Sequence, residues 1–141
     1  AQESRGLGDV YKRQALAASS QRKIEQAELT EAQALSDIAL LVEKNWLGVE
    51  QARRQYQAQQ AQEDLARELL RLREAGLREG TSTTLDLIDA SLNLAKVQTQ
   101  RAELANQYVQ ALAALLESTG QSEEFDRFMA QADIQIPPDA P

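Results

Sequence analysis

The feature that most constrains the fold is a long stretch without helix breakers. The 63 residues from Ala15 to Leu77 contain no proline, and their only glycines are Gly48 and Gly76. Proline removes a backbone hydrogen bond and glycine costs about 1 kcal/mol inside a helix, so such a stretch favours one continuous helix. At ~1.5 Å per residue this helix would span roughly 95 Å, far more than a compact domain needs.

Apolar residues recur every seven positions along this stretch, and a single residue, Glu63, interrupts the series. A seven-residue apolar repeat predicts a helix that packs along its length on another helix. Ile38, Ala52 and Ala66 supply a second, offset row. The repeat positions are Leu35, Val42, Val49, Tyr56, Leu70 and Leu77.

A second helix is expected from about Thr84 to Glu117, with a wider apolar face. Its apolar residues form three adjacent rows, more than one coiled-coil partner requires. Such a face suits a helix with neighbours on both flanks, as in a wall of helices, and it also suits a helix in an ordinary bundle core. The rows are Ala90, Val97, Leu104 and Ala111; Leu87, Leu94, Tyr108 and Leu115; and Ile88, Ala95, Ala102, Val109 and Leu116.

A short polar stretch, "EGTSTT", separates the two helices at residues 79–84. Gly80 can adopt the left-handed conformation that ends a helix, and Thr81, Ser82 and Thr83 are typical of loops and helix N-caps. We therefore expect a tight turn here. The predicted fold class is all-α, an elongated antiparallel hairpin of long coiled-coil helices.

Two aspartates, Asp86 and Asp89, come directly after this turn. The helix dipole favours acids in the first turns by about 0.3–1 kcal/mol each, and Asp86 has nearly the spacing of a capping box with Thr83. Both are therefore explained as ordinary helix-start acids. Their spacing of three also places them on one face, so in a symmetric oligomer whose tips converge they would form a ring of acids.

The hairpin leaves part of the first helix without a partner. The second helix, ended by the glycine of "STG" at 118–120, would finish opposite Lys44–Gly48. Residues 15–45 would then be an unpaired apolar helix of roughly 45 Å, which implies further chain or other subunits. The apolar residues left in water would be Leu35, Ile38, Leu41 and Val42.

The composition excludes several function classes. The chain has no cysteine and no histidine, so it lacks thiolate metal ligands and the commonest general base. No nucleophile motif or phosphate-binding loop is present, and we expect no enzyme activity, no cofactor and no bound metal. A net charge of −7 argues against a nucleic-acid partner.

The first fourteen residues, "AQESRGLGDVYKRQ", differ from the rest of the chain because they hold two of the six glycines and lack apolar periodicity. "DVYKRQ" is identified as the translation of a transposon-end adapter used in sequencing-library preparation. We interpret residues 1–14 as a non-native segment, with a native flexible N-terminus as the alternative. On the first interpretation the chain is cut at its N-terminal side, and its native start lies upstream.

Residues 75–120 resemble the second repeat of the TolC family of outer-membrane channel proteins. The shared pattern is a glycine, a Thr/Ser-rich turn, Asp-apolar-apolar-Asp-Ala, a leucine a few residues later, an aromatic at Tyr108 and a closing "L…G". Trp46 lies where the family has an aromatic in its long helix. The resemblance covers residues 15 to about 130.

This resemblance implies an architecture and a function. Family members are trimers in which an outer-membrane β-barrel continues into a periplasmic α-helical tunnel. In these terms, 15–78 is the long tunnel helix, 79–84 the periplasmic tip turn, 84–117 the returning helix, and 118–141 the equatorial segment with an extended tail. The implied function is a passive exit duct, the outer-membrane channel of a tripartite efflux or type I secretion system.

The resemblance also implies sites and partners. Asp86 and Asp89 match the aspartates that line the periplasmic entrance, and the turn residues from Gly80 to Thr83 would contact a periplasmic adaptor protein. The expected partners are two further copies in a homotrimer, the adaptor, an inner-membrane pump, and the outer membrane through strands upstream of this chain. The expected location is the periplasmic side of a Gram-negative outer membrane.

Two positions depart from the best-known family member. This chain has Leu77 and Ser82 where that member has a tyrosine and a basic residue that help to latch the closed entrance. We therefore expect a looser closed state. In the tail, Phe125, Phe128 and Met129 form a short amphipathic stretch, and Phe125 and Phe128 are expected to dock on the outer wall of the tunnel. "IPPDAP" predicts an extended end, with a frayed tail at residues 134–141 as the alternative.

Two alternatives to the duct remain. One is the helical hairpin of a periplasmic adaptor, which is also long, antiparallel and specific at its tip. Such hairpins are flanked by β domains on both sides, which the tail at 118–141 does not indicate. The other is a generic coiled-coil scaffold, which has no special need for two acids after the turn.

Overall fold

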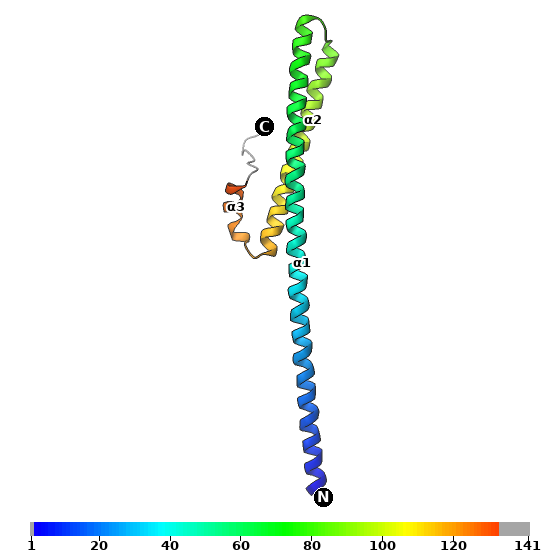
Figure 1. The fold of residues 1–141 in the computed structure, drawn as a ribbon, viewed down its shortest axis with the longest axis vertical. Helices are drawn as coiled ribbons and strands as arrows, with labels where there is room; N and C mark the ends of the chain where they lie inside the picture. The colour runs from blue at the N-terminus through cyan, green and yellow to red at the C-terminus, as the bar shows by residue number, and fades with distance from the viewer. Residues whose placement is uncertain (1, 133–141) are drawn as a thin grey trace. The chain divides into compact units, whose positions relative to one another are not determined.

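The computed structural model describes residues 2–132. Within them the chain forms a long helix α1 (Gln2–Glu79), a second helix α2 (Thr84–Ser118), a short 3-10 helix η1 (Ser122–Glu124) and a last helix α3 (Phe125–Gln131) (Figure 1). No strand occurs between residues 2 and 132. The predicted all-α fold class is confirmed.

Helix α1 begins earlier than the sequence predicts. We expected the long helix from Ala15, but it extends back to Gln2 through Gly6 and Gly8. A nucleated helix gains one hydrogen bond for each added residue, so two glycines at about 1 kcal/mol each do not stop it. The adapter origin of residues 1–14 stays a prediction.

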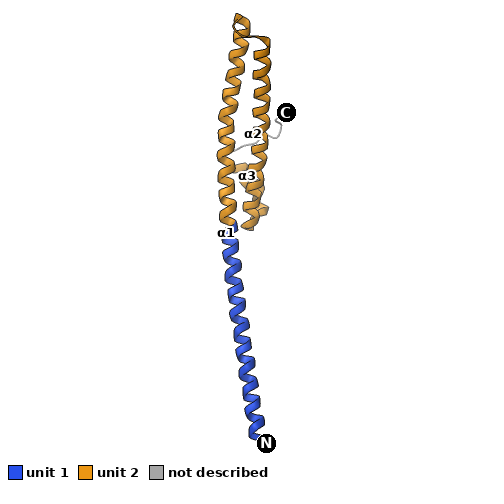
Figure 2. Cartoon of the chain, turned by 90° about the vertical axis from the view of Figure 1, so that its right-hand side faces the viewer, with its two compact units in different colours: residues 1–41 blue, residues 42–141 orange. Residues whose placement is uncertain are grey.

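The chain divides into two units, residues 1–41 and residues 42–141, and the boundary falls inside α1 (Figure 2). In the first unit every described residue is exposed. Leu35, Ile38 and Leu41 are open to water as expected, with Leu35 62% exposed. Val42 was expected to be exposed as well, but it is half-buried. The covered part of α1 therefore begins about one turn earlier than predicted.

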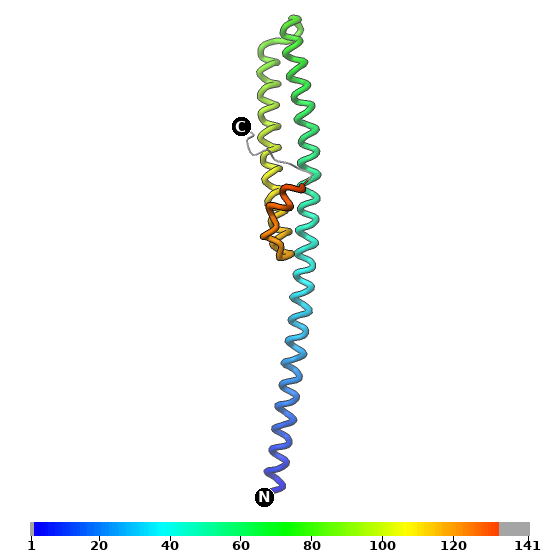
Figure 3. The backbone as a smooth tube through the Cα atoms, turned by 90° about the vertical axis from the view of Figure 1, so that its left-hand side faces the viewer, coloured from blue at the N-terminus to red at the C-terminus, as the bar shows by residue number. Residues whose placement is uncertain are grey.

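In the second unit, α2 runs back along α1 as an antiparallel hairpin (Figure 3). Asn45 lies near the end of the hairpin that is far from the turn. Its Nδ2 donates a hydrogen bond to the backbone oxygen of Ala114 at 3.1 Å. The residue count from the turn predicts that α2 ends opposite Lys44–Gly48, and this contact confirms it.

The core of the hairpin is a narrow seam between the two helices. Its main cluster consists of Val49, Ala52 and Tyr56 on α1 and Ala105 and Tyr108 on α2. On α1 these positions follow the three-four spacing that places residues on one helix face. Toward the turn the buried apolar residues are fewer and mostly smaller, namely Ala66, Ala90 and Val97.

The seam is narrower than the sequence predicts. Ile88, Ala95 and Ala102, from the third predicted row of α2, are exposed, and so is Leu77 at the end of the heptad series on α1. A hairpin offers each helix only one partner, so apolar residues on the other faces stay outside. The residue that interrupts the heptads, Glu63, is instead buried, with only 2% of its surface exposed.

The chain turns back after α2. Gly120, with φ 73°, ends α2 in the left-handed conformation expected of the glycine in "STG". Phe125 and Phe128 of α3 are half-buried, and Ala132 packs against the main cluster of the seam. The docking of the two phenylalanines on a tunnel wall stays a prediction, and "IPPDAP" lies outside the described residues.

Candidate functional site at the hairpin tip

The tip turn is built on Gly80. Its φ of 79° lies in the left-handed region that glycine adopts without steric cost. The Gly80 N–H donates to the Leu77 oxygen at 3.3 Å, and the Thr81 N–H donates to the Gly76 oxygen at 2.7 Å. These two bonds form the Schellman arrangement, which satisfies carbonyls left free at a helix end. Gly80 therefore ends α1 in the conformation predicted for it.

The turn folds closely over Gly76. The backbone N–H of Ser82 also donates to the Gly76 oxygen, at 3.1 Å, and the Thr81 hydroxyl donates to it at 3.2 Å. A Cβ on residue 76 would overlap the Ser82 hydroxyl oxygen and lie 3.0 Å from Thr81 Oγ1. The sequence showed Gly76 only as a tolerated helix glycine. The sequence signal for its close contact with the turn is its position four residues before Gly80, the glycine that ends α1.

Thr83 and Asp86 form a reciprocal cap on α2. The Thr83 hydroxyl accepts the Asp86 N–H at 3.1 Å, while the Thr83 N–H donates to Asp86 Oδ2 at 2.9 Å. The Thr83 hydroxyl also donates to the same oxygen at 2.9 Å. This is a capping box in which aspartate replaces the usual glutamate. The interpretation of Asp86 as a helix-start acid is therefore confirmed.

The tip presents two carboxylates in different settings. Hydrogen bonds from the backbone and hydroxyl of Thr83, together with the positive charge of Arg73, hold the pKa of the Asp86 carboxyl below its ordinary value. Asp89 lies about one turn further along α2 and is exposed. One carboxylate is thus bound within the cap, and the other is open to water.

The outer flanks of the tip carry apolar residues that the seam does not use. They follow the three-four spacing of a helix face on both helices. At about 100° per residue, these positions fall outside the seam. The two flank stripes consist of Leu65, Leu69 and Leu72 on α1, and of Leu85, Ile88 and Leu92 on α2, all of them exposed.

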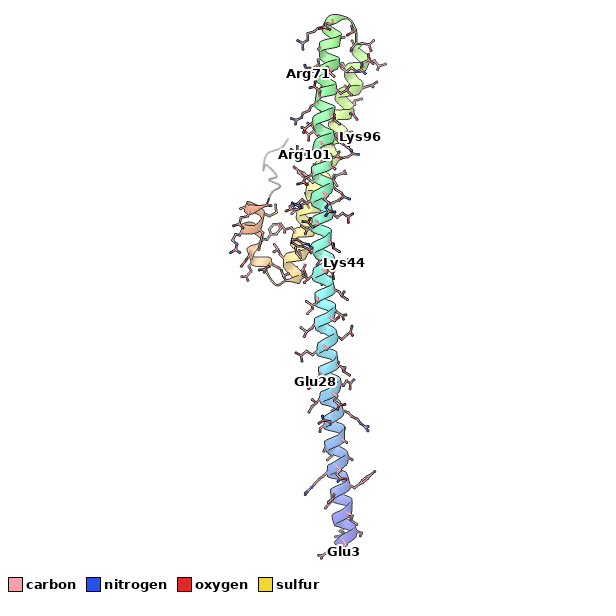
Figure 4. The ribbon with its side chains drawn as sticks, viewed as in Figure 1. Glu3, Glu28, Lys44, Arg71, Lys96 and Arg101 are labelled. Atoms are coloured by element: carbon pink, nitrogen blue, oxygen red, sulfur yellow. The ribbon has the colours of Figure 1, made fainter. Side chains whose placement is uncertain are left out.

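The seam also holds a polar cluster, which sequence reasoning missed. Glu63 accepts from Arg101 across the seam at 2.8 Å and from Arg67 on its own helix at 2.6 Å. Arg101, labelled in Figure 4, also donates to the Tyr56 hydroxyl at 2.8 Å. The available signal was the position of Glu63 in the heptad series, because a charged residue at such a position is buried when the partner helix supplies a counter-charge.

Residues 2–132 contain no group of three or more acidic, histidine or cysteine side chains that could hold a metal ion. None of the described helices combines the length and apolar character needed to cross a membrane.

Comparison with known proteins identifies the family. A family model described as outer membrane efflux protein matches residues 7–121, which is more than half of the chain. The chain itself matches no curated protein and no solved structure. The helical hairpin fits the helical tunnel of this family, whose members are channels and not enzymes. The chain therefore belongs to the outer membrane efflux protein family and is a component of an outer-membrane efflux channel.

Proposed function

We propose that this chain forms the periplasmic tunnel part of a passive exit duct in a tripartite efflux or type I secretion system. The observation that carries the proposal is a hairpin with apolar residues on its outer flanks, in a chain of an efflux channel family. The family match favours the channel over an adaptor hairpin or a generic coiled-coil scaffold.

The flank stripes support assembly into a wall of helices. Leu69 and Leu72 on α1 and Leu85 and Leu92 on α2 belong to stripes that lie in water in the single chain. Burial of apolar surface is favourable by about 25 cal/mol per Å², so neighbouring hairpins that cover these stripes would stabilise the assembly. We propose that the assembly is a homotrimer.

The tip would form the periplasmic entrance of the duct. In a trimer, Asp86 and Asp89 of each chain would surround the opening and make it favourable for cations. A hydrogen bond from Thr83 holds the Asp86 side chain in place, whereas the exposed Asp89 side chain can reorient toward a passing solute. Their part at the entrance would be binding and gating, with no chemical step.

The turn from Gly80 to Thr83 would be the contact for the periplasmic adaptor, which links the duct to an inner-membrane pump. Thr81 and Thr83 are exposed, and Leu77 at the end of α1 adds apolar surface beside them. Leu77 and Ser82 lack the groups that would latch a closed entrance, so an adaptor would open it by small shifts of the hairpins.

Dye efflux from living bacteria tests this proposal. Cells that lack their own outer-membrane efflux channel would express the intact protein with its adaptor and pump. We expect them to accumulate less dye than cells without the intact protein. Replacing Thr81 and Ser82 together by bulky glutamates should restore accumulation, whereas glutamate at exposed Gln60 should not. Equal accumulation with and without the intact protein would contradict the proposal.

A further inference from the structure

The Glu63 cluster is the feature of the hairpin that the proposed function leaves unexplained. Glu63 lies on α1 at a position where a coiled coil normally carries an apolar residue, and only 2% of it is exposed. Its main partner, Arg101, lies across the seam on α2. A carboxylate at such a place is unfavourable unless it has partners, so the cluster needs a physical explanation.

On the turn side of this cluster, the apolar seam does not strongly specify how the two helices align. Between the cluster and the turn, the buried apolar residues are Ala66, Ala90 and Val97. Apolar burial is non-directional, and small side chains present similar surfaces at successive turns. An alignment shifted by one turn would therefore bury a similar apolar area in this half of the hairpin.

The polar contacts, in contrast, are directional and tie specific atoms across the seam. Glu63 Oε2 accepts from Arg101 Nη1 at 2.8 Å, and Glu63 Oε1 accepts from Gln98 Nε2 at 3.4 Å. The Arg101 guanidinium donates through Nε and Nη2 to the Tyr56 hydroxyl, at 3.1 and 2.8 Å. It also lies over the Tyr56 ring, with Cζ 5.2 Å from the ring centre.

A further contact of the same kind lies one turn from Glu63. Gln59, which is also buried, donates through Nε2 to the Val97 backbone oxygen at 3.2 Å and to Gln100 Oε1 at 3.1 Å. A slip of one helical turn would shift these partners by about 5.4 Å and break all the contacts together. It would also leave the Glu63 carboxylate with Arg67 alone, which is on its own helix.

We propose that Glu63 and Arg101 form a register lock, which holds α1 and α2 in a single alignment. The misaligned hairpin is disfavoured because the buried Glu63 carboxylate loses every partner across the seam and keeps only Arg67 on its own helix. Polar groups at seam positions fix the register of coiled coils in the same way. In the proposed duct, and only if that proposal holds, the locked hairpin would move as one rigid body when the entrance opens. The lock itself does not depend on transport.

Distances between spin labels on the two helices test the lock. The chain contains no cysteine, so Gln60→Cys on α1 and Glu103→Cys on α2 can be labelled at two exposed positions without background. Labelled full-length chains are diluted with unlabelled chains, so that distances within one chain dominate. The measurement compares the parent with the variant Glu63→Leu plus Arg101→Met, which keeps similar side-chain volumes but removes the directional contacts.

We expect one narrow distance distribution for the parent. The double variant should stay helical but gain a second population, displaced by about 5.4 Å along the hairpin. A double variant with the same single narrow distribution as the parent would overturn the proposal. The distance measurement does not involve efflux. The register lock can therefore be contradicted while the proposed duct is upheld, or upheld while the duct is contradicted.

An exposed ion pair on α1 provides the matched control. Glu68 and Arg71 are bonded at 2.6 Å but lie outside the seam, so Glu68→Leu plus Arg71→Met should leave the distribution narrow. Broadening in this control would overturn the proposal, because added apolar surface alone would then explain the effect. If the seam variant does not fold, Glu63→Ala is measured instead, because alanine removes the acceptor of the Arg101 and Gln98 bonds, and a parent-like distribution would again count against the lock.

Discussion

Thr83 and Asp86 cap the start of α2 reciprocally, since each donates its backbone N–H to a side-chain oxygen of the other, at 2.9 and 3.1 Å. Asp86 therefore has a structural task at the tip besides its proposed place at an entrance. Asp89 takes no part in this capping box. The two aspartates can thus be separated by experiment.

The first prediction concerns the stability of the tip. Thr83→Ala should lower the free energy of unfolding by about 1 kcal/mol, because it removes the hydroxyl that accepts the Asp86 N–H. Asp86→Ala should be destabilising as well, and Asp89→Ala clearly less so. Urea unfolding followed by circular dichroism measures all three. Equal losses of unfolding free energy for Asp86→Ala and Asp89→Ala would show that the capping bonds of Asp86 do not stabilise the tip.

The second prediction concerns acid. Hydrogen bonds from Thr83 lower the pKa of Asp86. For Glu63, burial raises the pKa, but the hydrogen bonds from Arg101 and Gln98 and the positive charges of Arg101 and Arg67 together lower it below its ordinary value. A carboxyl with a depressed folded pKa stabilises the fold fully above its unfolded pKa, and this stabilisation is lost as pH falls through the folded value.

The ordinary pKa values are 3.8 for aspartate and 4.5 for glutamate. These two groups should therefore keep their stabilising effect above about pH 5 and lose it progressively below. Thermal melts across this range, run beside Asp86→Asn plus Glu63→Gln, measure their share. The double variant should lose less stability with acid than the parent. Parallel curves for the two proteins would mean that these carboxyls are not responsible.

The third prediction compares the same substitution at two glycines of α1. Gly48→Ala should stabilise the hairpin by roughly 0.5–1 kcal/mol, since an added Cβ there meets no atom within 4 Å and alanine favours helix. Gly76→Ala should instead destabilise it, because the new Cβ overlaps the Ser82 hydroxyl oxygen. Melting temperatures measure both changes, an increase for Gly48→Ala and a decrease for Gly76→Ala. A stabilised Gly76→Ala would mean that the turn does not fold tightly over residue 76.

The fourth prediction ranks the arginines around Glu63. Arg101→Met should cost about 3 kcal/mol, because it removes the partner of a buried carboxylate that holds the two helices together. Arg67→Met should cost less, since the Arg67 side chain is 59% exposed and pairs within its own helix. Arg71→Met, at an exposed pair with Glu68, is the control and should change little. The loss of unfolding free energy should therefore be largest for Arg101→Met, smaller for Arg67→Met and smallest for Arg71→Met.

The sequence predicted the hairpin well because its signals are local. Gly80 and Thr83 act on the backbone next to them, so a glycine followed by hydroxyl residues is enough to place the turn and the start of α2. The contact between Asn45 and Ala114 then results from counting residues, because both helices rise by the same amount per residue.

The features that the sequence did not predict depend on contacts across the seam. Glu63 looks like an interruption of the heptad series in the sequence. Its burial could not be predicted because its partner Arg101 lies 38 residues away, and only the alignment of the two helices brings them together. Gly76 is similar, since its importance comes from the turn that folds over it. Ile88 was placed in a buried row, yet a single chain has no second partner helix to cover it.

The most direct test of the exit duct is the ion selectivity of the intact protein in planar lipid bilayers. We predict open channels that prefer cations and that multivalent cations block from the periplasmic side. Asp86→Asn plus Asp89→Asn should weaken both properties while the channel still forms, because asparagine retains a side-chain oxygen that can accept the Thr83 N–H. Unchanged selectivity in this variant would contradict the acidic entrance, and an intact protein that forms no channel at all would contradict the duct.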